Sequence, residues 1–279
     1  MFRVLSCVLL LATVACDADG DGLSNQFEKK MGIDAHNTDT DGDGLSDAEE
    51  LDWGSDPLLP DTDGDGLNDR AEFEHGTDPN NVDTDGDAYW DTWEVTEGTD
   101  PLDADDRIYE GGWPYQPNKD DWTAEADEHR EAGGALPRWT FQDHHGDELD
   151  LYDFAGSGDD LMLIFATSWC GPSHSLADRV NEAGGCVAEA IRTGKLRVIT
   201  VLTEGDRAPA TARDLEKWDD SHHNPHVPVV MDPDNHLGTW GQIRSFPDST
   251  HIDLTTMTVG GKITNGDYAG KWIETHCED

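Results

Sequence analysis

Carboxylate side chains recur at alternate positions in four short segments of the first half of the chain. In each segment aspartate stands at positions 1, 3 and 5, aspartate or asparagine at position 9, and glutamate at position 12. Calcium binds six to eight oxygen ligands, and this spacing turns the carboxylates toward the inside of a tight loop. The sequence therefore predicts four calcium-binding loops. Their predicted metal ligands are Asp17, Asp19, Asp21, Asn25 and Glu28; Asp39, Asp41, Asp43, Asp47 and Glu50; Asp61, Asp63, Asp65, Asp69 and Glu72; and Asp83, Asp85, Asp87, Asp91 and Glu94.

The sixth position of the loops is glycine in three copies and alanine in the fourth. Glycine permits the sharp turn around calcium because it adopts positive φ without steric cost. Gly22, Gly44 and Gly66 meet this requirement, whereas Ala88 takes the same position in the fourth loop. The fourth turn is therefore predicted to be strained, and its site departs most from the calcium pattern.

The loops begin at residues 17, 39, 61 and 83, a constant interval of 22 residues. This repeat resembles the thrombospondin type 3 repeats that bacteria also use in surface proteins, and the resemblance implies Ca²⁺ wrapped by the chain with little conventional core. Dockerin modules share the loop but normally carry two copies. A solvated acidic tail, the other alternative, would keep neither the period nor the glycines. Without metal, the segment buries too little apolar surface to offset chain entropy, so we expect calcium to fold it.

A cysteine in the second half stands in the sequence SWCGPSHS, residues 168–175. The apolar run at 161–166 predicts a buried strand before it, and a helix is predicted from about Pro172. The N–H groups and dipole of a helix N-terminus favour a thiolate, which is the nucleophilic form of cysteine. We therefore predict that Cys170 is a nucleophile and that Ser173 donates a hydrogen bond to it.

Strands and helices alternate around this cysteine. Strands are predicted at 139–142, 148–151, 161–166, 196–202 and 227–231, helices from 172 and at 208–219, 236–243 and 272–277, and a closing hairpin at 249–258 and 261–267. Together with the motif at Trp169 and Cys170, this order resembles the thioredoxin-like redoxins of the TlpA and ResA branch. The resemblance implies an α/β fold with a central mixed sheet flanked by helices. It also implies a cis-proline loop at Pro247 facing the thiol, and a docking surface shaped by Trp169 and Pro247.

Two residues of the thioredoxin pattern are missing. Ser173 replaces the second cysteine, and Ile164 stands where typical thioredoxins carry a buried aspartate. Both losses affect the release of a mixed disulfide, which needs a second thiolate. We therefore predict a monothiol oxidoreductase that acts through Cys170, with a protein thiol or small-molecule thiol as resolving partner. The alternative is a catalytically degenerate fold that serves as a surface binding or structural module on a calcium-stiffened stalk. A peroxidase is disfavoured because its proline would precede the cysteine, whereas Pro172 follows.

The other cysteines have different predicted roles. Cys186 lies about 16 residues beyond Cys170, and a continuous helix of that length spans about 24 Å. Because a disulfide needs Cα atoms within about 7 Å, those two cysteines could pair only if the helix unwound, and Gly184-Gly185 is a candidate break. A structural disulfide between Cys186 and Cys277 is the favoured alternative.

The first residues of the chain predict export. An apolar run at 4–14 is too short to span a membrane stably, and it ends in small residues before Cys16. This segment resembles a bacterial lipoprotein signal, which implies lipidation of Cys16, although Thr13 departs from the usual leucine. An ordinary signal peptide is the alternative. Either one predicts an exported protein of the cell envelope, facing the periplasm or the outer surface, where disulfides persist.

Charge and composition complete the prediction. The formal net charge is −43, and about half of the carboxylates lie in residues 17–106. A nucleic-acid partner is disfavoured because phosphate binding needs clustered lysine and arginine. The histidines of 222–226 could form a transition-metal site, but a solvated loop is favoured. We predict a signal segment at 1–16, calcium repeats at 17–106, a linker at 107–133 and a thioredoxin-like domain at 134–279.

Overall fold

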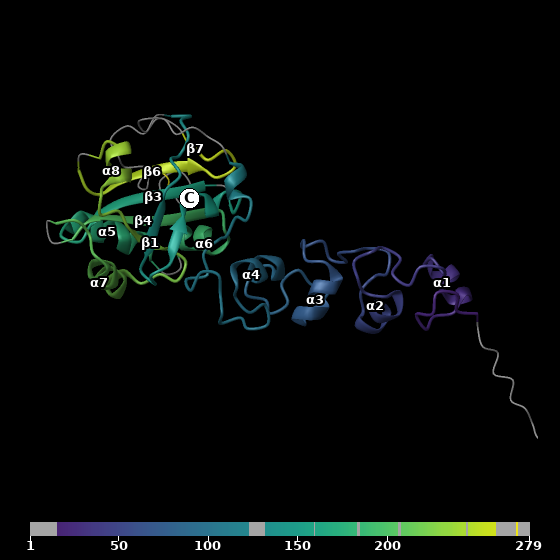
Figure 1. The fold of residues 1–279 in the computed structure, drawn as a ribbon. Coiled ribbons are helices and arrows are strands. Elements are labelled where there is room, and N and C mark those ends of the chain that lie inside the picture. The colour runs from purple at the N-terminus through teal and green to yellow at the C-terminus, as the bar shows by residue number, and fades with distance from the viewer. Residues whose placement is uncertain are drawn as a thin grey trace, which may run out of the picture. The chain divides into compact units, whose positions relative to one another are not determined.

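The fold is described by a computed structural model, which covers residues 16–122, 132–158, 160–182, 185–205, 208–243, 245–260 and 272. The chain divides into two compact units, Met1–Arg107 and Ile108–Asp279 (Figure 1). Among the described residues, no helix combines the length and the apolar character that crossing a bilayer requires. Residues 1–15 of the signal segment predicted at 1–16 lie outside the described residues.

The first unit repeats one short helix after each acidic loop. The helices are α1 Asn25–Met31, α2 Asp47–Trp53, α3 Asp69–His75 and α4 Asp91–Glu97. Each begins at position 9 of its loop, and within residues 16–107 no other helix occurs. With a single helix per repeat, the array lacks the first helix of a helix–loop–helix calcium motif.

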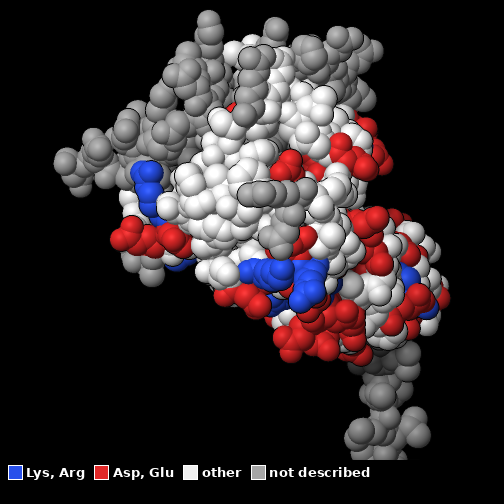
Figure 2. Space-filling view, turned by 90° about the vertical axis from the view of Figure 1, so that its left-hand side faces the viewer, with Lys and Arg blue, Asp and Glu red and all other residues white. Residues whose placement is uncertain are grey.

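Buried carboxylates replace most of the apolar core in this unit. Within residues 16–107, the buried hydrophobic side chains are Ile33, Leu45 and Tyr89. On the face drawn in Figure 2, acidic side chains cover more of the surface than lysine and arginine do. Since so little apolar area is removed from water, the hydrophobic effect cannot hold this unit together by itself.

The second unit is a mixed sheet of seven strands with order β2-β1-β5-β4-β3-β6-β7. Strands β3 to β5 pair in parallel, and the others pair antiparallel. The strands are β1 Thr140–Asp143, β2 Glu148–Asp150, β3 Asp160–Thr167, β4 Leu196–Glu204, β5 Val229–Met231, β6 Asp248–Asp253 and β7 Thr258–Val259. The helices are η1 Lys119–Asp121, η2 Leu151–Phe154, α5 Gly171–Val180, α6 Cys186–Arg192, α7 Ala212–His222 and α8 His236–Trp240.

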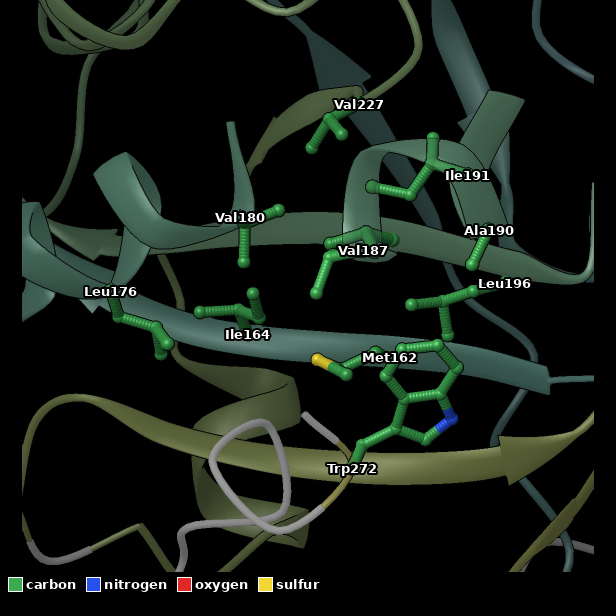
Figure 3. Packing of buried hydrophobic residues seen from close by; sticks show 11 residues of the cluster. Met162, Ile164, Leu176, Val180, Val187, Ala190, Ile191, Leu196, Val227 and Trp272 are labelled. Atoms are coloured by element: carbon green, nitrogen blue, oxygen red, sulfur yellow. The ribbon is translucent and has the colours of Figure 1, made fainter. Parts of the chain in front are cut away.

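Strand β3 lies in the middle of the sheet and is buried along nearly its whole length. Successive side chains of a strand point to opposite faces, and alternate residues of β3 accordingly contact the helices. Met162 and Ile164 pack with Leu176 and Val180 of α5 and with side chains of α6 (Figure 3). Because β3 is rigidly packed on both sides, the residue at which α5 begins has a fixed position.

Two predictions about element ends in the second unit can be compared with the structure. The helix predicted from residue 172 is interrupted, as the candidate break at Gly184-Gly185 allows: α5 ends at Val180 and α6 starts after Gly185. The closing hairpin is shorter than predicted. Both of its strands, β6 and β7, and the turn between them lie within 248–259, where the sequence predicts a single strand at 249–258. The second predicted strand, 261–267, and all of the helix predicted at 272–277 except Trp272 lie outside the described residues.

Part of the predicted linker belongs to the second unit. Tyr109 Oη donates a hydrogen bond of 2.5 Å to Asp153 Oδ2, and Trp113 Nε1 donates one of 2.6 Å to Asp143 Oδ2. All four side chains are buried. The second unit therefore begins at Ile108, earlier than the predicted domain start at residue 134.

Candidate functional site

The aspartates at positions 1, 3 and 5 come together in all four loops. One carboxylate oxygen of each lies within 4.8 Å of those of the other two. The groups are Asp17, Asp19 and Asp21; Asp39, Asp41 and Asp43; Asp61, Asp63 and Asp65; and Asp83, Asp85 and Asp87. A dense group of carboxylate oxygens with no nitrogen or sulfur suits a hard cation such as Ca²⁺.

The glutamate at position 12 is fully buried in every loop and has an oxygen without a hydrogen-bond partner among the described residues. This holds for Glu28, Glu50, Glu72 and Glu94. Burial, and then the neighbouring aspartates, raise the pKa of the last three to about 8. Burying an unpaired carboxylate is costly, so these oxygens fit a cation inside the loop. Calcium held by positions 1, 3, 5 and 12 would supply the positive charge that these carboxylates lack.

Position 9 is used differently from the sequence prediction. The carboxylate of Asp47 accepts hydrogen bonds from the backbone N of Thr40, at 2.8 Å, and from its hydroxyl, at 2.9 Å. Asp69 and Asp91 accept equivalent bonds from the threonines at position 2 of their loops. The position-9 aspartate is therefore a support of its own loop and is absent from that loop's group of aspartates.

The same aspartate faces the preceding loop. Asp47 has an oxygen within 4.8 Å of oxygens of Asp21 and Glu28 in the first loop. The third loop shows the same relation: burial, and then neighbouring carboxylates that include Asp91, raise the pKa of Asp63 to about 6. One loop thus completes the acidic site of the loop before it.

The residue at position 9 of the first loop agrees with this arrangement. It is Asn25, and the repeat contains no earlier loop for it to complete, whereas the other three copies carry aspartate. The absence of a charge at this one position is the sequence signal that could have revealed the shared ligand. Asn25 Oδ1 is buried without a hydrogen-bond partner among the described residues.

The turn of the fourth loop is strained, as the sequence predicts. Ala88 has φ of 83°, which is the left-handed region that alanine disfavours by about 1–2 kcal/mol. Its backbone N donates to Asp83 Oδ2 at 3.0 Å, as Gly44 N donates to Asp39 Oδ2 at 3.1 Å. The fourth loop therefore keeps the shape of the others at the cost of backbone strain.

The thiol of Cys170 lies where β3 gives way to α5. Cys170 is the N-cap of that helix, and its side chain is free and half-buried. Its Sγ donates to the carbonyl oxygen of Phe246 at 3.3 Å, and the Phe246–Pro247 peptide bond is cis. The prediction that a cis-proline loop faces the cysteine is confirmed.

Ser173 and Trp169 have separate environments. Ser173 is fully buried on the inner face of α5, and its Oγ has no hydrogen-bond partner among the described residues. The predicted hydrogen bond from Ser173 to the thiol is therefore wrong, because the serine points into the core. Trp169 is 48% exposed, and its Nε1 donates to Glu204 at 3.3 Å. Its exposed ring leaves an apolar surface beside the thiol.

A histidine pair that the sequence analysis missed secures the segment before the cysteine. His174 Nε2 contacts the carbonyl oxygen of Ser168 at 2.9 Å, and His174 Nδ1 lies 2.5 Å from His222 Nε2. His222 Nδ1 lies 3.0 Å from Asp178 Oδ1, and the ring of Trp218 stacks on His174. The pair thus ties α5 and the loop before Cys170 to α7.

The histidine pair has one proton too few when both rings are neutral. The Ser168 carbonyl and the Asp178 carboxylate can only accept, so three contacts need three ring protons, and two neutral imidazoles carry two. Burial, and then His174, lower the pKa of His222, while Asp178 opposes this shift. The side chain of His222 is nearly buried, whereas His223 and His226 are exposed, as the predicted solvated loop requires. No group of three or more metal-ligating residues in the described part of the chain includes a histidine.

Cys186 is disulfide-bonded. Because Cys16 and Cys170 are free, neither is its partner, and a Cys170–Cys186 disulfide is excluded. Cys277, the predicted partner, lies outside the described residues.

A model of the bacterial TSP3 repeat matches residues 17–32, 39–60, 61–82 and 83–104. No curated protein sequence matches the chain. The family match and the sheet described above confirm the predicted architecture. The chain combines tandem bacterial TSP3 repeats with a thioredoxin-like fold that has a mixed sheet flanked by helices.

Solved structures similar to this chain match about half of it. The thioredoxin domain of a thiol-disulfide oxidoreductase from Bacteroides vulgatus is 17% identical, with 53% of this chain and 99% of that one covered and a TM-score of 0.40. An exposed lipoprotein thioredoxin from Streptococcus pneumoniae is 21% identical, with 50% and 99% covered and a TM-score of 0.36. A putative protein disulfide isomerase from Bacteroides thetaiotaomicron is 14% identical, with 54% and 92% covered and a TM-score of 0.42.

Proposed function

We propose that this protein is an exported calcium-binding protein whose thioredoxin-like unit exchanges thiols and disulfides through the single thiol of Cys170. The observation that carries the proposal is the position of that thiol. It stands at the N-terminus of the ten-residue helix α5, beside the carbonyl that precedes cis-Pro247, with the exposed ring of Trp169 next to it in sequence. A helix N-terminus favours the thiolate that attacks a disulfide.

The exchange proceeds in two steps. The Cys170 thiolate attacks one sulfur of a partner disulfide, forming a new S–S bond, and the other partner sulfur leaves as a thiolate that takes up a proton. A second thiolate, from a small-molecule or protein thiol, then attacks the mixed disulfide and releases either Cys170 or the partner. Ser173 cannot perform this second step, and Cys186 is already in a disulfide. The resolving thiol therefore comes from a separate molecule.

The acidic array is proposed to fold on calcium and to act as a stiffened spacer. The support is the set of buried, unpaired carboxylates in a unit that has almost no apolar core. Binding energy for the metal then becomes folding energy. Calcium is the proposed resident ion, and the thiol chemistry takes place in the other unit.

Lipidation of Cys16 and location in the cell envelope belong to the same proposal. They rest on the apolar run at 4–14 and on the small residues before the cysteine. Cys16 is exposed and free, and its carbonyl accepts a hydrogen bond from Asn25 N at 2.8 Å. An acyl chain on this thiol would anchor the protein to a membrane immediately before the first calcium loop.

One contact favours a second candidate, a thioredoxin-like binding or structural module without redox activity. The thiol of Cys170 donates its hydrogen bond to the backbone carbonyl of Phe246, so the sulfur is held by the cis-proline loop. Ser173 donates no hydrogen bond to that sulfur.

Trapping of a mixed disulfide distinguishes the two candidates. The full chain is incubated with a model peptide disulfide, and adducts are measured by intact mass with and without a small thiol. Exchange predicts an adduct at Cys170 that small thiol removes and that is missing from Cys170→Ala, which keeps at most the adduct formed by the exposed thiol of Cys16. Alanine removes the thiol with only a small loss of side-chain volume, and circular dichroism checks that the Cys170→Ala variant folds. Equal adduct levels in the wild type and in Cys170→Ala, or none in either, would leave only the binding role.

A further inference from the structure

The chain starts a fifth repeat after the fourth loop but does not complete it. Continuing the interval of 22 residues places a first position at Asp105, a second at Asp106 and a third at Arg107. In the other repeats the side chain at position 2 accepts a hydrogen bond from a backbone N–H of the preceding linker, as Thr84 Oγ1 does from Asp78 N at 2.9 Å. Asp106 makes the same contact, because its Oδ2 accepts from the backbone N of Asp100 at 3.1 Å. The repeat geometry therefore extends to Arg107.

The fifth repeat supplies no carboxylate to the fourth loop. Its ninth position would be Trp113, and the second unit has already begun there. In the first loop the aspartate at this position of the next loop, Asp47, lies within 4.8 Å of oxygens of Asp21 and Glu28. In the second and third loops the corresponding Asp69 and Asp91 act electrostatically on Asp41 and Asp63. The fourth loop has no such aspartate.

Arg107 takes the place of the missing contact. In the second and third loops, Oδ2 of the position-5 aspartate accepts a backbone N–H from the next repeat, Arg70 N on Asp43 at 2.7 Å and Thr92 N on Asp65 at 3.0 Å. The same oxygen has no hydrogen-bond partner among the described residues in the first loop, where it belongs to Asp21, and in the fourth, where it belongs to Asp87. The Nε of Arg107 lies 3.6 Å from Asp87 Oδ2.

We propose that Arg107 terminates the calcium array and makes the fourth loop its weakest calcium site. Compared with the other three loops, the fourth lacks the aspartate of a following repeat. It has instead the guanidinium of Arg107 near its calcium ligands. The Asp87 side chain is fully buried while that of Arg107 is 38% exposed, so solvent only partly screens the guanidinium. The affinity of such loops depends on the charge of their ligands, and this inference rests on the proposed calcium binding of the array.

Arg107 also gives the array a defined end. A carboxylate at position 107 would extend the acidic pattern of the repeats beyond the fourth loop. The guanidinium of Arg107 instead neutralises part of the negative charge of that loop. The last loop then exchanges calcium at concentrations that leave the first three loaded. The strain at Ala88 acts on the same loop through the backbone, so the test must separate the two causes.

Calcium titration of the full chain by isothermal calorimetry tests the proposal. The wild type should show three tighter sites and one weaker site, and Asp85→Asn should remove the weaker one while Asp63→Asn removes a tighter one. Arg107→Gln should tighten the weakest site about fivefold or more, because it removes a nearby cation. Arg107→Lys, which keeps the charge, should resemble the wild type.

Three results would overturn the inference while leaving calcium binding intact. These are four equal sites in the wild type, an unchanged weakest site in Arg107→Gln, or an Ala88→Gly variant in which all four sites become equal with Arg107 present. A wild type that binds no calcium refutes the proposed function of the array itself. Circular dichroism with saturating calcium establishes that each variant folds.

Discussion

Replacing Asp47 by asparagine should weaken calcium binding at the first loop rather than at the second, to which Asp47 belongs in sequence. Its carboxylate lies within 4.8 Å of ligand oxygens of Asp21 and Glu28. We take an ion bound among these carboxylates to lie roughly 5 Å from the Asp47 charge. Even with the dielectric constant of water, a divalent ion and a unit charge at that distance attract by about 1.7 kcal/mol, which corresponds to about 20-fold in affinity.

Asparagine is the right replacement because it has the same shape and can still accept from Thr40 N. The assay is calorimetric calcium titration of the full chain, with a double-mutant cycle to identify the affected loop. Asp19→Asn removes a first-loop ligand and Asp41→Asn a second-loop ligand. Asp47→Asn should be non-additive with Asp19→Asn and additive with Asp41→Asn.

The converse control uses the first loop. Asn25→Asp adds a carboxylate at the one position 9 that has no preceding loop, so the affinity of no neighbouring site should rise. The reasoning is refuted if Asp47→Asn couples to Asp41→Asn and not to Asp19→Asn. Position 9 would then bind calcium within its own loop, as the sequence pattern alone suggests.

Three further changes have defined outcomes. Ser173→Cys places a buried thiol three residues after Cys170, in the first turn of the same helix; if its side chain can turn toward the Cys170 thiol, the pair should form a disulfide on oxidation, seen as a loss of about 2 Da, and mixed disulfides should no longer accumulate. Ala88→Gly should lower the calcium midpoint of the circular dichroism transition by relieving about 1 kcal/mol of strain, and an unchanged midpoint would argue against strain. Burial, the largest cause, lowers the pKa of His222 in the fold; if its cost outweighs the contact that a third ring proton would restore in the histidine pair, the second unit should lose stability as pH falls below about 6.5. His222→Gln should flatten that dependence in urea unfolding, and an equal slope in both proteins would contradict it.

The sequence by itself determined the features that depend on neighbouring residues. The interval of the loops, the carboxylates at positions 1, 3, 5 and 12, and the strain at Ala88 all arise within twelve consecutive residues. The buried strand before Cys170 follows from an apolar run, because a strand covered on both faces needs no polar residue. The cis-proline facing the thiol came from a family resemblance rather than from local chemistry.

Only the tertiary structure decided which distant groups meet. Asp47 completes the first loop and Arg107 contacts Asp87 because successive repeats stack, and no local pattern specifies what lies across that contact. Ser173 points into the core rather than to the thiol because it lies on the face of α5 that packs against the core. His174 and His222, 48 residues apart, meet because α5 and α7 pack on the same side of the sheet. Local spacing selects the ligands and the nucleophile, whereas packing over long sequence distances sets the charges around them.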